Sequence, residues 1–499
     1  MTITEDLTMV DRTDPVIPGF HPDPSICRVG DDYYLATSSF EYFPGVPIFH
    51  STDLVHWTQI GHALTRRSQF PLVEPGPSRG IYAPTLRHHD GRFWLITTNV
   101  SDVERGQVLV TTADPRGEWS EPVFVPEARG IDPDLAWDVD GTCYLTWNEL
   151  RFGAGNFGIR QAPFDPTTGR LLEEPYPLWE GTGMQAPEGA HLYRVGATWY
   201  LMLAEGGTER GHSVTIARGQ SPRGPFEPCP RNPILSHRST DHPVQNVGHA
   251  DLVETPTGEW AAVYLGVRPG GSTPGYHVNG RETFLAGIEW EDGWPRFDET
   301  AFAGAGTSDT AFADDFSGEA LDLRWVTPDG EPEACTRTIE AGIELVPRDG
   351  GLPALCARIT DARWRIGVRF ARDGQARVWM DPGHWYGIRR SGDRILVEGR
   401  IGSTTAVLSD VTAVDTVSLE IRAVDPRSLT RPLGDAGPDE IVFSTVSEAG
   451  LVTDLFRADG RYLSTEVASG FTGRMIALSA DGSPATLLGV SYESTTNEG

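Results

Sequence analysis

The sequence has few basic residues, no long hydrophobic run and no paired cysteines. It holds 41 Lys and Arg against 70 Asp and Glu in 499 residues, a formal net charge of −29. Nucleic acids and anionic membranes are bound through basic patches, so this excess of acids argues against both as partners. No apolar stretch approaches the roughly 18 residues of a transmembrane helix. The first 14 residues also lack the charged and then apolar pattern of a signal peptide, and we therefore expect a cytoplasmic chain.

The cysteines are odd in number and widely spaced. No two of them form a Cys-x-x-Cys pair, which predicts neither a disulfide framework nor a zinc site. We expect them to be buried thiols in a reducing compartment. They are Cys27, Cys143, Cys229, Cys335 and Cys356.

Turn-forming residues are plentiful instead, with 56 glycines and 38 prolines. Hydrophobic residues make up 39% of the chain, and together with the glycines this is a normal globular composition, which excludes disordered and collagen-like proteins. At roughly 150 residues per domain, the length predicts two or three domains, or one large repetitive domain with an attachment.

One pattern occurs five times in the first three hundred residues: a turn with glycine, followed by a strand of aromatic and apolar residues. The copies cover residues 30–35, 90–95, 140–145, 196–201 and 258–263. Each unit has room for four short strands, and radial repetition of such units is typical of a β-propeller, so five copies predict five blades. The alternative is a β-sandwich in which glycine and aromatic hairpins recur by accident.

The pattern changes after the fifth copy. Residues 301–309 are mostly small and indicate a linker. Beyond them, polar and apolar residues alternate with a period of two, for example in residues 364–370 and 417–422. We therefore predict an all-β protein with a five-bladed β-propeller over residues 1–305 and an antiparallel β-sandwich over residues 306–499.

The innermost strand of each propeller blade lines a central channel, so residues just before the five turns should face one another. Those at equivalent positions are Asp23, Tyr82, Asp132, Glu188 and His249. Cleavage of a glycosidic bond needs one protonated carboxyl as proton donor and one ionised carboxyl that activates water or attacks carbon. A third acid can raise the pKa of the donor by repulsion between like charges.

Several segments strongly resemble glycoside hydrolase family 43, whose members are β-xylosidases and α-L-arabinofuranosidases. They are residues 19–27, 31–35, 40–46 and 246–253, while residues 312–325 are similar to the start of the concanavalin-like sandwich of the β-xylosidase branch. The resemblance implies that Asp23 is the general base and Glu188 the general acid. Asp132 is then the acid that tunes the pKa of the general acid and has an orienting role. It also implies inversion of the anomeric centre.

Further roles follow from the same resemblance. Arg281 is similar to an arginine that reaches the substrate and the acids, and Phe40 and Tyr82 to walls of the sugar pocket. His249 is similar to an axial histidine that binds water or a calcium or sodium ion, although a core histidine is equally compatible with the sequence. Phe471, between two glycines, is expected on a sandwich loop that closes the pocket, with a ring buried inside the sandwich as the alternative.

Together these features predict an exo-acting inverting hydrolase for xylan and carbohydrate degradation. It would release terminal β-D-xylose, α-L-arabinofuranose or both from short oligosaccharides, and the sequence does not separate the two sugars. We expect that no cofactor is required. A structural calcium or sodium ion near the propeller axis and a homo-oligomer are both left open. The alternative is a non-catalytic propeller that binds carbohydrate or protein, but a pure binding site gains nothing from three acids that repel one another.

Overall fold

A computed structural model describes residues 13–495 except 152, 154, 413–415 and 427–436. Most of the N-terminal segment used for the signal-peptide expectation, residues 1–12, lies outside the described residues. The fold is all-β, as predicted. Helices in the described part are limited to α1 (Pro332–Cys335), α2 (Thr465–Ala468) and three 3₁₀ segments, Val103–Arg105, Asp349–Gly351 and Gly460–Leu463. None of these described helices has the length and apolar character needed to cross a membrane.

The N-terminal part forms five antiparallel sheets, one for each copy of the repeat. In every sheet the turn with glycine joins the first two strands. Sheet one contains β1 (Ser25–Val29), β2 (Asp32–Ala36), β4 (Gly45–Ser51) and β5 (Thr58–Leu64). Sheet two contains β6 (Thr85–His89), β7 (Arg92–Thr98), β8 (Gln107–Thr112) and β9 (Val123–Val125).

The other three sheets follow the same order. Sheet three contains β10 (Ile131–Trp137), β11 (Cys143–Arg151), β12 (Gly155–Asp165), β13 (Arg170–Leu171) and β14 (Tyr176–Pro177). Sheet four contains β15 (Glu188–Val195), β16 (Thr198–Glu205), β17 (Ser213–Gly219) and β18 (Glu227–Pro228). Sheet five contains β19 (Gln245–Glu254), β20 (Trp260–Val267), β21 (Glu282–Glu291) and β22 (Trp294–Asp298).

Neighbouring sheets share hydrophobic cores, and sheets one and five are neighbours too. Leu35 of β2 and Val263 of β20 belong to one buried cluster, although they are far apart in the sequence. Other clusters join each sheet to the next along the chain. The first strands, β1, β6, β10, β15 and β19, contact one another in the same cyclic order. The residues near the starts of these strands are therefore brought to one place.

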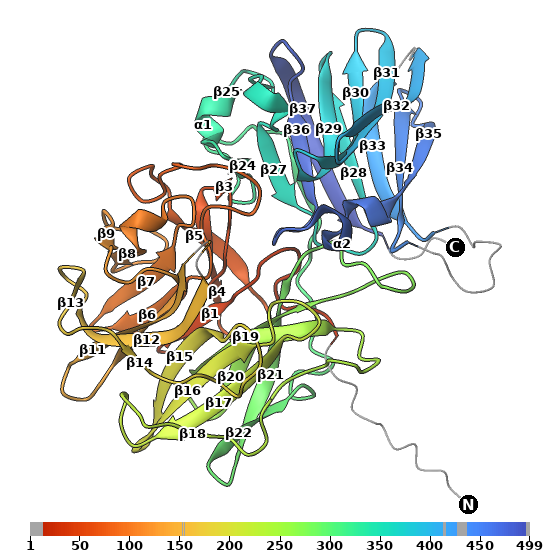
Figure 1. The fold of residues 1–499 in the computed structure, drawn as a ribbon. Helices are drawn as coiled ribbons and strands as arrows, with labels where there is room; N and C mark the ends of the chain where they lie inside the picture. Colours follow the sequence, from red (N-terminus) through yellow and green to blue (C-terminus); the bar gives the residue numbers. More distant parts are fainter. Residues whose placement is uncertain (1–12, 152, 154, 413–415, 427–436, 496–499) are drawn as a thin grey trace, which may run out of the picture.

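The C-terminal part consists of two large antiparallel sheets, drawn above the five small ones in Figure 1. One contains β23 (Phe312–Asp314), β25 (Thr336–Thr338), β26 (Ile343–Leu345), β28 (Trp364–Phe370), β33 (Thr416–Val424), β34 (Glu440–Ser447), β35 (Val452–Asp459) and β37 (Ala485–Ser494). The other contains β27 (Leu355–Arg358), β29 (Gly374–Asp381), β30 (His384–Ser391), β31 (Arg394–Ile401), β32 (Thr404–Thr412) and β36 (Met475–Ser479).

One hydrophobic core fills the space between these two sheets. Ile366 and Val368 of β28 pack in the same cluster as Val378 of β29 and Ile388 of β30. The bounds of β28 coincide with a strand predicted from the alternation of residues, and alternate side chains of β28 are buried. Apolar residues thus alternate with polar ones in β28 because one face of the strand packs in this shared core.

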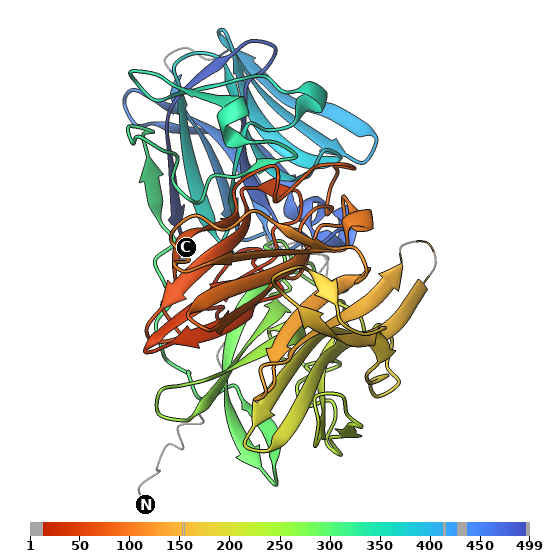
Figure 2. The ribbon, with the colours of Figure 1, turned by 90° about the vertical axis from the view of Figure 1, so that its left-hand side faces the viewer.

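The two parts of the chain are packed against each other. The predicted linker falls between β22 and β23 and contains no strand. Two short strands, β3 (Tyr42–Phe43) and β24 (Thr327–Pro328), pair across the junction. A hydrophobic cluster there contains Phe40 and Tyr42 from the N-terminal part and Trp379 from the C-terminal part. Figure 2 shows the two parts of the chain lying against each other in a view from the side.

Candidate active site

Four of the predicted site residues lie where the backbone is bent near the starts of the inner strands. Asp23, Asp132 and His249 have φ values of 55°, 55° and 47°, in the left-handed region that residues other than glycine rarely adopt. In sheet four the left-handed residue is Gly189, with φ of 58°, directly after Glu188. Irregular strand pairing follows the bend in β10, β15 and β19. Tyr82 does not share this conformation.

Asp23 is held as an ionised carboxylate. Its side chain is buried, Ser38 Oγ donates a hydrogen bond of 2.6 Å to Oδ2, and Arg281 Nη1 donates one of 3.0 Å to Oδ1. Nδ1 of His249 lies 3.7 Å from Oδ1. Burial alone would raise the pKa of Asp23, but the charges of Arg281 and His249 and the Ser38 hydrogen bond outweigh it, so the pKa is lower than usual.

Glu188 has the opposite electrostatic environment. Burial, together with the nearby charges of Asp132 and Asp23, raises the pKa of Glu188 to about 8, against the opposing charge of Arg281. Burial also raises the pKa of Asp132, where Asp23 adds to the effect and His249 opposes it. The Gly189 N–H donates a 2.9 Å hydrogen bond to Asp132 Oδ2, which fixes Asp132 beside the residue that follows Glu188. The site thus holds a protonated and an ionised carboxyl at neutral pH.

Three aromatic rings form a wall next to these acids. Phe40 stacks on Phe471 with ring centroids 5.9 Å apart, and Tyr82 meets both rings edge-on at 5.4 and 5.7 Å. The guanidinium of Arg281 lies 5.8 Å from the centroid of Phe40 and 5.4 Å from that of Phe471. Phe471 is anchored through its backbone N–H, which donates to Ser78 Oγ at 2.8 Å. The C-terminal part therefore contributes a ring to the site.

A cavity of about 420 Å³ adjoins this wall, within the usual size range of small-molecule sites. Arg281 and Phe471 line it, together with Thr208, whose hydroxyl accepts a 2.9 Å hydrogen bond from Arg281. A cavity of about 470 Å³, lined by Trp57 and Arg358 among others, contains none of the predicted site residues. The smaller cavity is therefore linked to Asp23 through Arg281, although the three acids are not among its lining residues.

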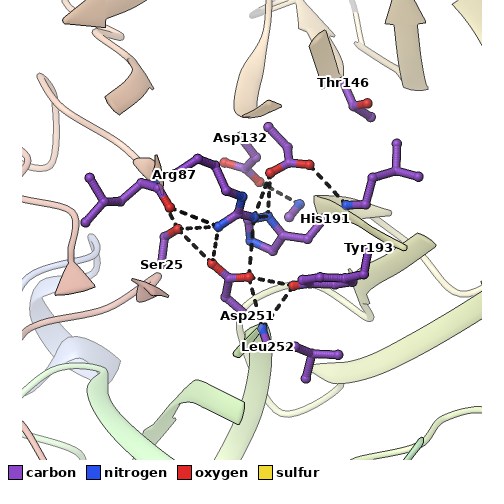
Figure 3. Close-up of polar contacts among 12 residues, drawn as sticks. Ser25, Arg87, Asp132, Thr146, His191, Tyr193, Asp251 and Leu252 are labelled. Carbon is purple, nitrogen blue, oxygen red and sulfur yellow. Dashed lines mark hydrogen bonds and ion pairs between the residues drawn. The ribbon is translucent and has the colours of Figure 1, made fainter. Parts of the chain in front are cut away.

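A buried polar network that the sequence analysis missed lies along the same inner strands (Figure 3). Arg87 of β6 donates to Asp251 Oδ2 and to Asp134 Oδ1, each at 2.7 Å. Its Nη2 lies 3.0 Å from His191 Nδ1, and Ser25 Oγ donates to Asp251 at 2.8 Å. The network thus takes side chains from all five small sheets. Burial would raise the pKa of Asp134 and of Asp251, but the charge of Arg87 outweighs it and both pKa values are lowered.

A signal for this network is present in the sequence. Ser25, Asp134 and Asp251 each follow a predicted site residue by two positions, and alternate residues of a strand share one face. His191 follows Glu188 by three positions because β15 contains an irregularity there. Extending the count by two residues would have found most of the network.

The contacts of His249 neither supply nor exclude the oxygen ligands that a calcium ion would need. Calcium requires six to eight oxygen ligands, whereas the ring of His249 packs against Gly189 and lies 6.2 Å from the ring of His191. The positive charge beside Asp134 and Asp251 is already supplied by Arg87. His249 is also absent from the cluster of metal-ligating side chains found among the described residues. The axial ion stays a prediction, and no catalytic step below uses it.

Opposite pKa shifts on two interacting carboxyls, one buried and one half-buried, are typical of enzymes that hydrolyse glycosidic bonds. A sequence model described as glycosyl hydrolases family 43 matches residues 12–295. A non-reducing end α-L-arabinofuranosidase of Bacteroides ovatus, BoGH43B, is 48% identical over 286 residues, which make up 56% of this chain and 52% of that protein. A xylosidase/arabinosidase of Butyrivibrio fibrisolvens is 48% identical over 298 residues, 58% of this chain and 56% of that protein.

Solved structures extend the similarity to the C-terminal part. The Bacteroides ovatus xyloglucan PUL GH43B superposes with a TM-score of 0.84 and 33% identity, over 97% of this chain and 99% of that chain. A xylan β-1,4-xylosidase from Bacillus halodurans superposes with a TM-score of 0.84 and 28% identity, over 96% and 99%. The chain belongs to glycosyl hydrolase family 43. It spans about half the length of the curated relatives it matches in sequence.

Proposed function

We propose that the chain is an exo-acting, inverting glycoside hydrolase that releases terminal β-D-xylose, α-L-arabinofuranose or both from short oligosaccharides. The observation that carries this proposal is the pair of opposite pKa shifts, lowered at Asp23 and raised to about 8 at Glu188. The names of the relatives, which include arabinofuranosidases and β-xylosidases, support the pentose substrate. Family membership supports an oligosaccharide partner.

In the proposed reaction the two carboxyls act on opposite sides of the anomeric carbon. Asp23 takes a proton from a water molecule, whose oxygen forms a bond to that carbon. Glu188 gives its proton to the glycosidic oxygen as the bond between carbon and leaving group breaks. Asp132 keeps Glu188 protonated by repulsion, and Arg281 keeps Asp23 ionised and oriented.

We also propose a finer description of the fold. The five small sheets would be the blades of a closed propeller, and the two large sheets a concanavalin-like sandwich, with the boundary near residue 305. Shared cores between all neighbouring sheets, including sheets one and five, support closure. The superposition on family members over nearly the whole chain supports the sandwich assignment. The cytoplasmic location stays a prediction from the sequence.

Chromogenic xylosides and arabinofuranosides test the activity directly. We expect the purified chain to hydrolyse at least one of them, and proton NMR in the first minutes to detect a sugar of the opposite anomeric configuration. A product of retained configuration would contradict the roles of Asp23 and Glu188. Absence of hydrolysis with retained sugar binding would instead favour the non-catalytic alternative, and efficient cleavage of intact xylan would contradict exo action.

The aromatic wall leads to a prediction about binding. Replacing Phe471 with alanine should raise KM for short substrates by about 2- to 10-fold, because an aromatic contact contributes about 0.5–1.5 kcal/mol. The change in kcat should be smaller, since Phe471 is not one of the reacting groups. Phe157→Ala is the control, because Phe157 is an exposed ring on β12 outside the site. Equal KM values for both variants and wild type would contradict a pocket role for Phe471.

The raised pKa of Glu188 predicts how the hydrolytic activity depends on pH. Activity requires protonated Glu188, so the rate should fall as pH rises through about 8. Asp132→Asn removes a negative charge that helps to raise this pKa, so the alkaline limb of kcat/KM should move to lower pH. Asp140→Asn, at an exposed aspartate, is the control and should leave the alkaline limb of kcat/KM unchanged. An unchanged or raised limb in Asp132→Asn would contradict the role given to Asp132.

A further inference from the structure

A cluster of two histidines and one glutamate lies on sheet five, apart from the carboxyls described above. His237 and His242 come from the segment between β18 and β19, and Glu299 directly follows β22. One potential ligand atom from each of the three lies within 4.8 Å of the others. His237 is 7% exposed and the other two are half-buried.

Hydrogen bonding indicates which ring nitrogen of His237 carries a proton. The carbonyl of Val244 can only accept, and it lies 2.8 Å from Nδ1 of His237, so this nitrogen carries a proton. In a neutral ring Nε2 then has a lone pair, and this atom lies 2.9 Å from Oε2 of Glu299. Two acceptors at this distance repel each other unless a positive charge lies between them. That charge is either a proton on His237 or a metal ion.

The third ligand and the second carboxylate oxygen favour the metal ion. Tyr264 donates a 2.8 Å hydrogen bond to Oε1 of Glu299, which leaves Oε2 directed at the histidines. The rings of His237 and His242 lie with centroids 3.9 Å apart, and each ring has a potential ligand atom within 4.8 Å of one from Glu299. A proton shared by His237 and Glu299 joins two of the three side chains, whereas a metal ion can bind all three.

We propose that His237, His242 and Glu299 bind a zinc ion. Two imidazoles and one carboxylate are a common zinc donor set, with water as the fourth ligand. Ligand bonds of about 2.0–2.2 Å place tetrahedral donor atoms roughly 3.4 Å apart, which small side-chain movements within this cluster achieve. The Val244 carbonyl behind His237 and the Tyr264 hydroxyl behind Glu299 are the outer partners that such ligands usually have.

The site would link two segments of the chain, one that leads to β19 and one that leads to the C-terminal part. Val244 interacts with both histidines, and its N–H lies 3.1 Å from Nδ1 of His242. The next residue begins β19, the strand that carries His249. Glu299 precedes the stretch that leads to the C-terminal part. A bound zinc ion would therefore restrain the entrance of β19, independently of the proposed hydrolase activity. Cysteine spacing predicted no zinc site, and the proposed one uses no cysteine.

Calorimetric titration of the untagged full chain with Zn²⁺, after treatment with a chelator, tests the proposal. We expect one Zn²⁺ per chain, no comparable binding of Ca²⁺ or Mg²⁺, and a higher Tm with zinc. Glu299→Gln should weaken zinc binding by about 100-fold or more, and the same is expected of His242→Gln, because each removes a ligand. His56→Gln, at an exposed histidine paired with Asp53, should bind zinc like wild type.

Glu299→Gln also distinguishes a bound metal ion from a proton shared by His237 and Glu299. A glutamine amide can donate to Nε2 of His237 and accept from Tyr264, so the fold is expected to persist while the zinc ligand is lost. Absence of Zn²⁺ binding in the wild type would overturn the proposal in favour of a protonated His237. Zinc binding as tight in Glu299→Gln or His242→Gln as in the wild type would overturn it as well, because the ion would then be bound elsewhere. If one variant does not fold, the other decides.

Discussion

Replacing Asp23 with asparagine should lower kcat by about 10²- to 10⁴-fold on every substrate, because an amide cannot accept the proton of the attacking water. The loss should not depend on the leaving group, since departure of that group does not involve Asp23. Asparagine retains an oxygen that can accept from Arg281, so folding should be preserved. The measurement is kcat for aryl glycosides with leaving groups of different acidity.

Asp140→Asn is the matched control for this substitution. Asp140 is an exposed aspartate in the turn between β10 and β11 and accepts a hydrogen bond from the N–H of Thr142. Its variant should have the turnover of wild type. If Asp23→Asn also keeps that turnover, or if a good leaving group restores its rate, Asp23 is not the general base.

Glu188→Gln should have an effect that depends strongly on the leaving group. For an oligosaccharide, whose leaving oxygen needs a proton, we expect a loss of about 10²- to 10⁴-fold. For an acidic phenol, which leaves without protonation, most of the rate should persist. A comparison of kcat for xylobiose-type and nitrophenyl-type substrates measures this difference, and equal losses on both would contradict the role of general acid.

The same variant should also change the pH profile. In the wild type, the rate should fall through about pH 8 as Glu188 loses its proton. Glutamine does not titrate, so the residual activity of Glu188→Gln on an acidic phenol glycoside should lack that alkaline limb. Persistence of the limb would mean that another group causes it, and the pKa assigned to Glu188 would be wrong.

The repeat was visible in the sequence because its physical cause is local. Each inner hairpin needs a tight turn, for which glycine is suited, followed by a strand whose aromatic and apolar side chains pack between sheets. The count back from these turns brought Asp23, Asp132, Glu188 and His249 together because each lies seven to nine residues before the glycine of its turn. The C-terminal sheets were predictable through alternation, as in β28.

Other features depend on three-dimensional packing that one sequence does not reveal. The opposite pKa shifts of Asp23 and Glu188 arise from burial and from Arg281, which is more than 90 residues from both. The left-handed conformation of Asp23 and Asp132 follows from the bends at the starts of the strands, and the residue type alone does not indicate it. The cluster with Glu299 joins distant residues without a motif, so its spacing gives no signal.

The network around Arg87 has a consequence for how this chain can evolve. In linear repeat arrays, duplication or deletion of a unit is tolerated because each unit contacts only its neighbours. Here the single charge of Arg87 is shared by acids from two other sheets, Asp134 and Asp251, and Ser25 and His191 complete the contacts. Recombination that inserted or removed one sheet would separate these partners and leave buried charges unpaired. Lineages of this protein should therefore diverge in loops and in the C-terminal part while the number of inner strands stays at five.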